Sequence, residues 1–197
     1  MPNQTKTKGL AASHHQREKT RALSEWLVMR SQQGNREARE ALLELWQERF
    51  YLYALRRLGS SEIARDVTQE ALLSICRNLA RLKDPVAFPS WSYRIVERRC
   101  VDCLRKTLRE REIIDTGKEL PDVAAPESQE SDAEVTSILA TLEPEIRSLL
   151  QLYYLDELSV AEIATILDIP AGTVKSRLFY ARKLLADKVD STSGGQK

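Results

Sequence analysis

The feature that most constrains the fold is an apolar repeat of helical period that runs along most of the chain. It is clearest where apolar side chains recur at every fourth position, at Ile63, Val67, Ala71, Ile75 and Leu79. This spacing places one face of an α-helix in a core. Aromatic residues make up only 6% of the chain, and glycine and proline number seven each, a composition that favours helices over strands. The sequence therefore predicts an all-α protein.

Glycine and proline residues divide the first half of the chain. The pattern predicts four helices, over residues 22–33, 36–58 and 90–108, with the third capped by Ser60 or Ser61 and carrying the apolar repeat as far as Leu79. Gly34 and Gly59 suit the left-handed caps that end the first two helices. Pro85 and Pro89 interrupt helical geometry and make residues 81–89 a loop.

Charge is strongly segregated, although the net charge is only +1. Residues 91–111 carry seven basic and three acidic side chains, residues 112–134 one basic and eight acidic, and residues 171–188 five basic and one acidic. The acidic block lacks apolar period, which favours an extended linker between two helical domains. The predicted organisation is a disordered tail, a four-helix domain, an acidic linker, a helix-turn-helix domain and a second disordered tail, over residues 1–20, 21–108, 109–132, 133–189 and 190–197.

The stretch SVAEIATILDIPAGTVKSRL, residues 159–178, predicts a helix-turn-helix. Ser159 and Glu162 match a capping box at the start of its first helix. Asp168 tolerates the left-handed backbone that the turn requires. The second helix is expected to bury one stripe, formed by Val174, Leu178, Ala181 and Leu185.

The opposite side of that second helix carries side chains suited to the major groove of DNA. Arginine reads guanine through paired hydrogen bonds, hydroxyls reach base edges or phosphates, and lysines hold the backbone. The predicted contacts to duplex DNA are Thr173, Ser176, Arg177, Phe179 and Tyr180 on this side, with Lys175 and Arg182 on its flanks. The alternative is an amphipathic hairpin with a solvated basic face.

The third predicted helix presents a second candidate surface opposite its apolar stripe. Asp66, Gln69 and Glu70 surround Leu73 there, so charged and amide groups would rim an apolar anchor. Such an arrangement is typical of a protein-docking face. The alternative is an ordinary solvated helix face.

The fourth predicted helix carries arginines along one side, at Arg94, Arg98, Arg105 and Arg109, with three aromatic side chains nearby, at Phe88, Trp91 and Tyr93. Arginines combined with aromatic rings suit single-stranded nucleic acid, because unpaired bases stack on rings. For Trp91 we expect a core position instead.

Cysteine usage and hydropathy exclude several classes of protein. Cys100 and Cys103 fall on the apolar side of the fourth predicted helix and lack a second ligand pair, so we expect buried thiols and no metal site. Three cysteines are too few for a secreted disulfide framework. The sequence shows neither a membrane-spanning run nor a signal peptide. We expect a cytoplasmic protein without a cofactor.

Three motifs together resemble one known family. They are ARDVTQEAL at residues 64–72, SWSYRIVERRCVDCLRK at residues 90–106, and LDELSVAEIATILDIPAGTVKSRLFYARKLL at residues 155–185. In this order, across an acidic linker, they resemble the extracytoplasmic-function, or group four, sigma factors of bacterial RNA polymerase, within the sigma-70 family. The resemblance covers about residues 23–188.

The resemblance implies a promoter-recognition subunit that is not an enzyme. Asp66, Gln69, Glu70 and Leu73 would dock on the polymerase's largest subunit, and the second helix of the helix-turn-helix would read the minus-thirty-five element. The loop and fourth helix would capture an extruded base and hold the melted non-template strand of the minus-ten element. The residues implied for this strand are Arg81, Lys83, Phe88, Tyr93, Arg94, Arg98 and Arg105. Core RNA polymerase, promoter DNA and an anti-sigma factor are the implied partners.

Two positions depart from the family pattern. Arg98 stands where many relatives have asparagine, and Ser92 replaces an apolar residue. The family's preference for particular bases of the minus-ten element therefore cannot be transferred to this chain.

Two other classes of function fit parts of the sequence. A stand-alone helix-turn-helix regulator that dimerises through its N-terminal helices would bind a two-fold symmetric operator without polymerase. An interaction module that acts through the Asp66 face would tolerate loss of charge between residues 173 and 182.

Overall fold

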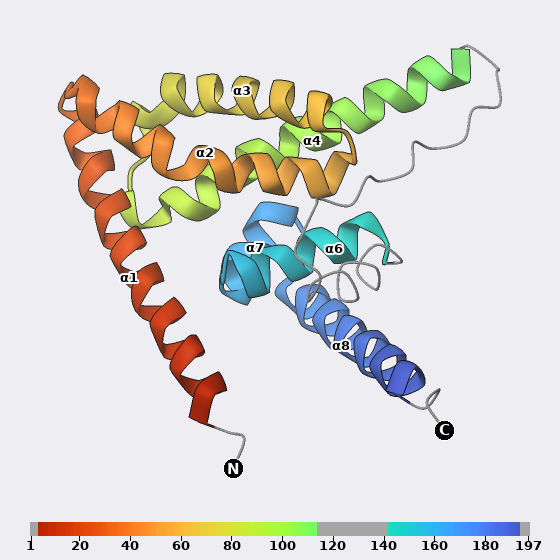
Figure 1. Cartoon of the computed structure of the whole chain (residues 1–197). Helices are drawn as coiled ribbons and strands as arrows, with labels where there is room; N and C mark the ends of the chain where they lie inside the picture. Colours follow the sequence, from red (N-terminus) through yellow and green to blue (C-terminus); the bar gives the residue numbers. More distant parts are fainter. Residues whose placement is uncertain (1–3, 114–141, 194–197) are drawn as a thin grey trace.

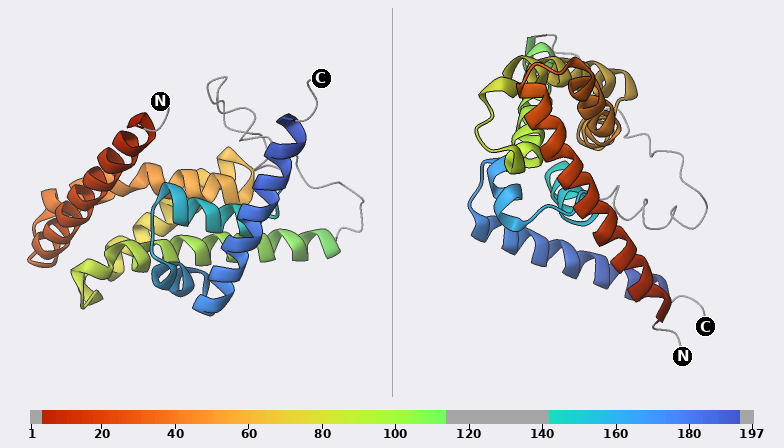
Figure 2. Two further views of the ribbon diagram at one scale, coloured as in Figure 1. Left: turned by 90° about the horizontal axis from the view of Figure 1, so that it is seen from below. Right: turned by 90° about the vertical axis from the view of Figure 1, so that its left-hand side faces the viewer.

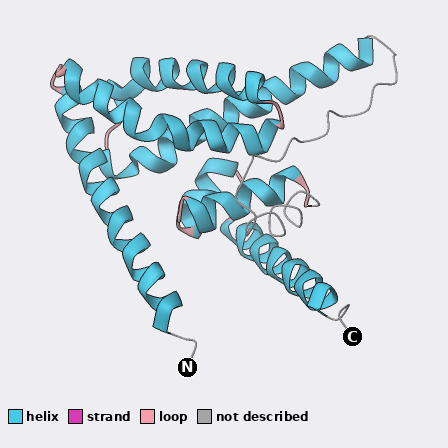
Figure 3. Ribbon diagram, in the orientation of Figure 1, coloured by secondary structure: helices cyan, strands magenta, loops and turns pink. Residues whose placement is uncertain are grey.

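The computed structural model describes residues 4–113 and 142–193. These residues form helices and connecting turns, without a strand among them, which confirms the all-α prediction (Figure 3). The α-helices are α1 Gln4–Gln32, α2 Arg36–Leu58, α3 Ser61–Asn78, α4 Phe88–Ile113, α6 Pro144–Leu150, α7 Val160–Leu167 and α8 Ala171–Ser193. Two 3-10 turns, Leu79–Arg81 and Pro85–Ala87, precede α4, and a π-helical segment, Gln151–Leu155, follows α6.

Local capping explains where α2 and α3 begin. The Asn35 side chain accepts a hydrogen bond from the Ala38 amide at 2.8 Å, and the Ser60 hydroxyl accepts one from the Ile63 amide at 3.4 Å. Gly59 ends α2 with a φ of 74°, a left-handed value that costs glycine little. The predicted helix over residues 36–58 is therefore confirmed at both ends.

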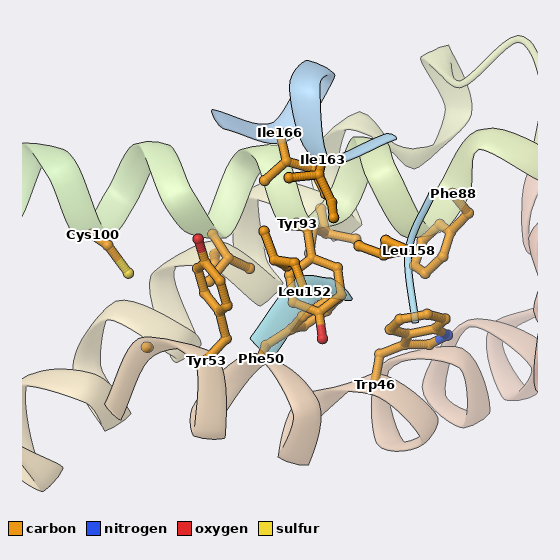
Figure 4. Close-up of a cluster of buried hydrophobic side chains, with 14 of the residues drawn as sticks. Trp46, Phe50, Tyr53, Phe88, Tyr93, Cys100, Leu152, Leu158, Ile163 and Ile166 are labelled. Atoms are coloured by element: carbon orange, nitrogen blue, oxygen red, sulfur yellow. The ribbon is translucent and has the colours of Figure 1, made fainter. Parts of the chain in front are cut away.

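The first four helices pack around a cluster of aromatic rings (Figure 4). The ring centroid of Tyr93 on α4 lies 5.2 Å from that of Phe50 and 5.4 Å from that of Tyr53, both on α2. Trp46 lies 5.7 Å from Phe88 in an edge-to-face contact. These rings are almost completely buried and fix α4 against α2.

The C-terminal helices pack on the same core. Figure 1 shows α6 and α7 lying against α2 and α4, and contacts join α6 to α2 and α7 to α4. Leu158 and Ile163 are buried and approach the aromatic cluster from this side (Figure 4). The described residues of the two predicted domains thus share one hydrophobic core.

Three helices are longer than the sequence predicts. α1 begins at Gln4 rather than near residue 22, and Figure 2 shows its N-terminal part extending beyond the other helices. α4 continues to Ile113, past the expected boundary at residue 108, and α8 continues to Ser193. No proline interrupts these extensions, and residues 109–113 are rich in arginine and glutamate, which favour helix; residues 190–193 are DSTS, so propensity does not explain the end of α8. Most of the expected linker, residues 114–132, lies outside the described residues.

The loop before α4 is shorter than predicted. α4 begins at Phe88, so Pro89 occupies its first turn, where an amide hydrogen would have no helical partner in any case.

The apolar stripe of α3 also differs from the prediction at its N-terminal end. Ile63 is 38% exposed, whereas Thr68 is buried, and a hydrogen bond of 2.6 Å from its hydroxyl to the Ala64 carbonyl satisfies this polar group.

A buried ionic network ties α4 to α2. The Tyr53 hydroxyl donates to the Glu97 carboxylate at 2.8 Å, and the Arg57 guanidinium lies 3.3 Å from the same carboxylate. Removing either Arg57 or Glu97 would leave the other charge without compensation inside the fold. None of the described helices has the length and apolar character needed to cross a membrane.

Candidate nucleic-acid and protein interfaces

The predicted docking face lies on the outer side of α3. Asp66, Gln69, Glu70 and Leu73 are all exposed, Leu73 by 57%. The opposite side of α3 is buried through Val67 and Ala71, so the helix cannot rotate this face inward without losing its core contacts. The Glu70 carboxylate makes a long ion pair of 3.6 Å with Arg99 of α4. The four predicted residues therefore share one accessible surface.

The helix-turn-helix forms as the sequence predicts. The Ser159 side chain accepts a hydrogen bond from the Glu162 amide at 3.2 Å, and the Glu162 carboxylate accepts one from the Ser159 amide at 2.8 Å. Asp168 ends α7 with a φ of 54°, the left-handed conformation expected of it. The capping box and the turn residue are both confirmed.

The outer side of α8 carries the predicted DNA contacts. Val174, Leu178 and Ala181 are buried, as expected, while the fourth member of that stripe, Leu185, lies outside the residues whose side chains the structure describes. Five of the predicted contacts are exposed and two are partly buried, the exposed ones being Lys175, Ser176, Phe179, Tyr180 and Arg182 and the others Thr173 and Arg177. The predicted residues thus occupy the part of the α8 surface that the buried stripe leaves accessible, with Lys175 and Arg182 at one edge and Thr173 and Arg177 at the other.

Two of these arginines are held by side chains that sequence reasoning did not identify. Arg177 lies 3.3 Å from the Glu145 carboxylate of α6. Arg182 donates a hydrogen bond of 2.8 Å to the Tyr154 hydroxyl, which raises the pKa of Arg182, and its guanidinium lies 5.7 Å from the Tyr153 ring centroid. The π-helical segment that carries both tyrosines gives no signal in the sequence beyond its aromatic pair.

The structure contradicts two of the predicted single-strand contacts. Phe88 and Tyr93 have no exposed surface, because their rings pack edge to face against Trp46, Phe50 and Tyr53. Neither ring is available to stack on a base in this arrangement. Phe88 and Tyr93 belong to the core.

A hollow of about 460 Å³ lies between α3 and α4. Its lining residues are Ser74, Asn78, Arg81, Trp91, Ile95, Arg98, Arg99 and Asp102. Arg81 and Arg98 were predicted to contact single-stranded DNA, and the structure places both in this lining. Trp91, for which we expected a core position, is partly buried, packs against the core beside Phe88 at 6.1 Å between ring centroids, and also lines the hollow.

The remaining predicted strand contacts are exposed but lie apart from this lining. Lys83 and Arg105 are exposed. Arg94 is also exposed, and its guanidinium lies 3.5 Å from the Asp168 carboxylate at the end of α7. The predicted arginines of α4 therefore do not share one site, because Arg98 lines the hollow, Arg94 pairs with Asp168, and Arg105 does neither.

Gln32 fixes the turn that leads into the hollow. Its side-chain amide donates hydrogen bonds of 3.0 Å to the Leu79 carbonyl and 2.7 Å to the Leu82 carbonyl. Both carbonyls flank Arg81, so α1 positions the backbone that carries this arginine. Only the tertiary fold reveals this role, because Gln32 stands 47 and 50 residues before its partners.

The cysteines lie inside the helical packing. Cys100 is completely buried and Cys103 is partly buried, and burial raises the pKa of the Cys100 thiol, so it stays protonated. Among the residues that the structure describes, no group of three or more histidine, cysteine or acidic side chains could hold a metal ion. Cys100 therefore has the environment of a structural thiol.

Replacing Cys100 with serine is expected to lower the free energy of unfolding by roughly 1–3 kcal/mol, because a hydroxyl is more costly than a thiol to bury without a partner. Equilibrium unfolding in urea measures the change. Zinc content, measured on the wild-type chain and the variant, should be the same and far below one equivalent. Stoichiometric zinc that disappears in the variant would contradict a structural role.

Comparison with known proteins finds two family models that match the chain. A family model described as Sigma-70 region 2 matches residues 42–110, and one described as Sigma-70, region 4 matches residues 132–185. Among curated proteins, the chain is 30% identical to the ECF RNA polymerase sigma-E factor of Haemophilus influenzae, over 83% of this chain and 93% of that protein. It is 32% identical to the protein of the same name from Escherichia coli K12, over 83% of this chain and 92% of that protein.

Solved structures share the fold. The chain resembles CnrH, solved in complex with the cytosolic domain of CnrY, with a TM-score of 0.61 and 20% identity over 86% of this chain and 98% of that one. It also resembles RpoE from Bartonella quintana, solved with the anti-sigma factor NepR, with a TM-score of 0.66 and 20% identity over 77% of this chain and 96% of that one. From its sequence relatives, the chain belongs to the ECF family of RNA polymerase sigma factors.

Proposed function

We propose that this sigma factor docks on core RNA polymerase through α3, reads the duplex minus-thirty-five element with α8, and holds the melted minus-ten strand at the hollow between α3 and α4. Membership of the family supports the general role, which is promoter-specific transcription initiation with RNA polymerase. The observation that carries the detailed proposal is the hollow, because it combines arginines with a partly exposed tryptophan.

The lining of the hollow fits a single strand better than a duplex. The ring of Trp91 can stack against an unpaired base, and such stacking contributes about 1–3 kcal/mol per base. Arg81 and Arg98 supply positive charge for the phosphates, while the Asn78 amide and the Asp102 carboxylate can meet polar base edges. Base extrusion costs a few kcal/mol, which these contacts together can offset.

The segregated charge supports recognition that depends on the polymerase. The basic surfaces of α4 and α8 can bind DNA, while the acidic residues between them keep the net charge of the chain at +1. A free chain with so little net charge binds the chromosome's nonspecific sites weakly. The polymerase would then supply most of the affinity, and the chain the selectivity.

The proposal also covers partners and location. The names of the solved relatives describe complexes with an anti-sigma factor or with a cytosolic protein domain, which supports binding of a similar regulator by this chain. The assigned roles are binding roles, without a catalytic residue or a cofactor. Because the proposed partner is RNA polymerase, we place the chain in the cytoplasm.

The decisive experiment measures strand capture by Trp91. Holoenzyme is assembled with wild-type chain or with Trp91→Ala, and opening of a promoter labelled with 2-aminopurine in the minus-ten element is followed by fluorescence. Trp91→Ala should lower the equilibrium constant for opening by about tenfold, which corresponds to one lost stacking contact. The matched control is Trp26→Ala, which removes a tryptophan that is 53% exposed on α1. Equal opening by Trp91→Ala and wild type would contradict strand capture at the hollow.

A second prediction concerns recognition of the duplex. Arg177→Ala is expected to weaken binding of holoenzyme to its preferred minus-thirty-five sequence by about 1–3 kcal/mol if Arg177 reads a base edge. Lys183→Ala, an exposed charge removal on the same helix, should reduce binding to all sequences alike. Gel-shift titrations against a set of minus-thirty-five substitutions measure both. An equal loss on every sequence for Arg177→Ala would reduce its role to a phosphate contact.

A further inference from the structure

The π-helical segment Gln151–Leu155 lies beside α8 and takes no part in the function proposed so far. A π-helical turn is rare in proteins and often marks a functional site. This one buries Gln151 and Leu152 and leaves Tyr154 49% exposed. The segment therefore adds a tyrosine to the surface next to the helix proposed to read the duplex.

Two tyrosines of this segment hold the Arg182 side chain of α8. The Arg182 Nε atom donates a hydrogen bond of 2.8 Å to the Tyr154 hydroxyl, and the guanidinium lies 5.7 Å from the centroid of the Tyr153 ring. The two rings meet edge to face, with their centroids 4.9 Å apart. Tyr153 is partly buried and packs against the core, so the cluster is anchored to the fold. Arg182 thus has a fixed direction although it is exposed.

The two arginines predicted to contact duplex DNA are held in different ways. Arg177 lies 3.3 Å from the Glu145 carboxylate, which offsets its charge. Arg182 is held by tyrosines, which are neutral side chains, and no carboxylate pairs with it among the residues that the structure describes. Its position is therefore fixed while its positive charge stays uncompensated. A preorganised cation of this kind suits an anionic ligand.

The place of Arg182 on α8 favours a phosphate of duplex DNA as that anion. Lys175 lies on the same edge of the helix, about 10 Å away along the axis, and Phe179 lies between them. Both side chains are exposed. They form a basic edge beside the side of α8 proposed to read bases, and cations that flank a helix in the major groove contact the DNA backbone.

We propose that Tyr154 and Arg182 form a phosphate-binding pair, in which Tyr154 positions the guanidinium against one backbone phosphate of the minus-thirty-five element. The pair rests on the proposed function, because it requires α8 to bind that element. Tyr154 occupies the Nε atom of Arg182, so the terminal nitrogens of the guanidinium face the phosphate oxygens. Tyr154 is thus a positioning residue, which acts on DNA through Arg182.

The first test measures binding of holoenzyme, assembled with the full-length chain, to promoter fragments that differ in the minus-thirty-five element. Tyr154→Phe keeps the ring and removes the hydroxyl, and it should weaken binding about threefold to fivefold. Arg182→Ala should weaken binding about tenfold. Both losses should be the same on every sequence, because a phosphate contact carries no base information. The double variant should bind as Arg182→Ala does, because Tyr154 acts only through the arginine.

The second test locates the phosphate. A neutral methylphosphonate replaces one backbone phosphate of the minus-thirty-five element at a time. At one position this change should weaken binding of the wild-type holoenzyme about tenfold, have no effect on Arg182→Ala, and have a reduced effect on Tyr154→Phe. The slope of the logarithm of the binding constant against that of the salt concentration should fall by about 0.9 for Arg182→Ala, which corresponds to one phosphate.

Tyr51→Phe is the matched control, because it removes a hydroxyl from a partly buried tyrosine on α2. It should bind every fragment as the wild type does. The midpoint of unfolding in urea should be the same for wild type, Tyr51→Phe and Tyr154→Phe, so that weaker DNA binding does not reflect a loss of fold. A methylphosphonate profile of Tyr154→Phe identical to that of the wild type would overturn the positioning role.

Arg177→Ala separates failure of this pair from failure of the proposed function. Wild-type binding by Tyr154→Phe and Arg182→Ala, with weaker binding by Arg177→Ala, would overturn the phosphate pair alone and leave an acidic protein surface as the anion that Arg182 meets. Losses for Tyr154→Phe that differ between minus-thirty-five sequences would indicate base reading and would also overturn it. If Arg177→Ala binds as the wild type does as well, the proposed role of α8 fails together with the pair.

Discussion

Replacing Asp66 and Glu70 together with lysine is expected to abolish association with core RNA polymerase and to leave the fold intact. Both carboxylates are exposed on α3, beside the apolar surface of Leu73. The double change reverses two charges at the proposed docking face and would meet a basic partner surface with repulsion. Pull-down of core polymerase by the tagged chain measures the association, and a loss of at least a hundredfold is expected, about 2.7 kcal/mol or more.

The fold should survive because neither side chain supports the core. The ion pair between Glu70 and Arg99 is long and exposed, so its loss costs less than about 1 kcal/mol. A double variant of Glu37 and Glu40 to lysine makes the same change of charge on exposed positions of α2 and serves as the control. If Asp66→Lys/Glu70→Lys retains polymerase as well as this control does, α3 is not the docking face.

Replacing Phe88 with alanine is expected to destabilise the protein by about 3–5 kcal/mol, the usual cost of removing a buried phenylalanine. Phe88 has no exposed surface and packs against Trp46 at the first turn of α4. Phe179→Ala provides the contrast, because that ring is 70% exposed on α8 and its loss should change stability by less than about 0.5 kcal/mol.

Equilibrium unfolding in urea distinguishes a Phe88 ring buried in the core from one exposed to bind the melted strand. A core role predicts a large fall in the midpoint, whereas a stacking role predicts wild-type stability with reduced binding of a single-stranded minus-ten oligonucleotide. Wild-type stability of Phe88→Ala would therefore contradict the burial of this ring.

The parts of the fold that the sequence predicts well depend on local interactions. The capping box at Ser159, the left-handed Asp168 and the glycine that ends α2 each involve residues within one helical turn of each other. The exposed face of α3 follows from helical period alone, since a buried Val67 and Ala71 leave Asp66 and Glu70 outside. Such features are encoded in short stretches of sequence.

The errors arise where distant segments decide the outcome. An aromatic ring before or within a helix can stack on a ligand or enter a core, and Phe88 and Tyr93 enter the core because α2 supplies Trp46, Phe50 and Tyr53 opposite them. The same packing leaves Trp91 at the rim of the hollow.

The sequence pattern also could not predict polar contacts between residues far apart in the chain. Tyr53 and Glu97 are 44 residues apart, and Arg21 and Glu162 are 141 residues apart. The burial of Asp156 depends on how α7 meets α2 and α4, which no local pattern specifies.

Run-off transcription with purified core polymerase, the purified chain and a promoter library tests the central claim most directly. The account predicts defined transcripts only when chain and polymerase are both present, from promoters that share a minus-ten and a minus-thirty-five element. A chain that yields no transcripts with polymerase, yet protects a palindromic site without it, would contradict this account.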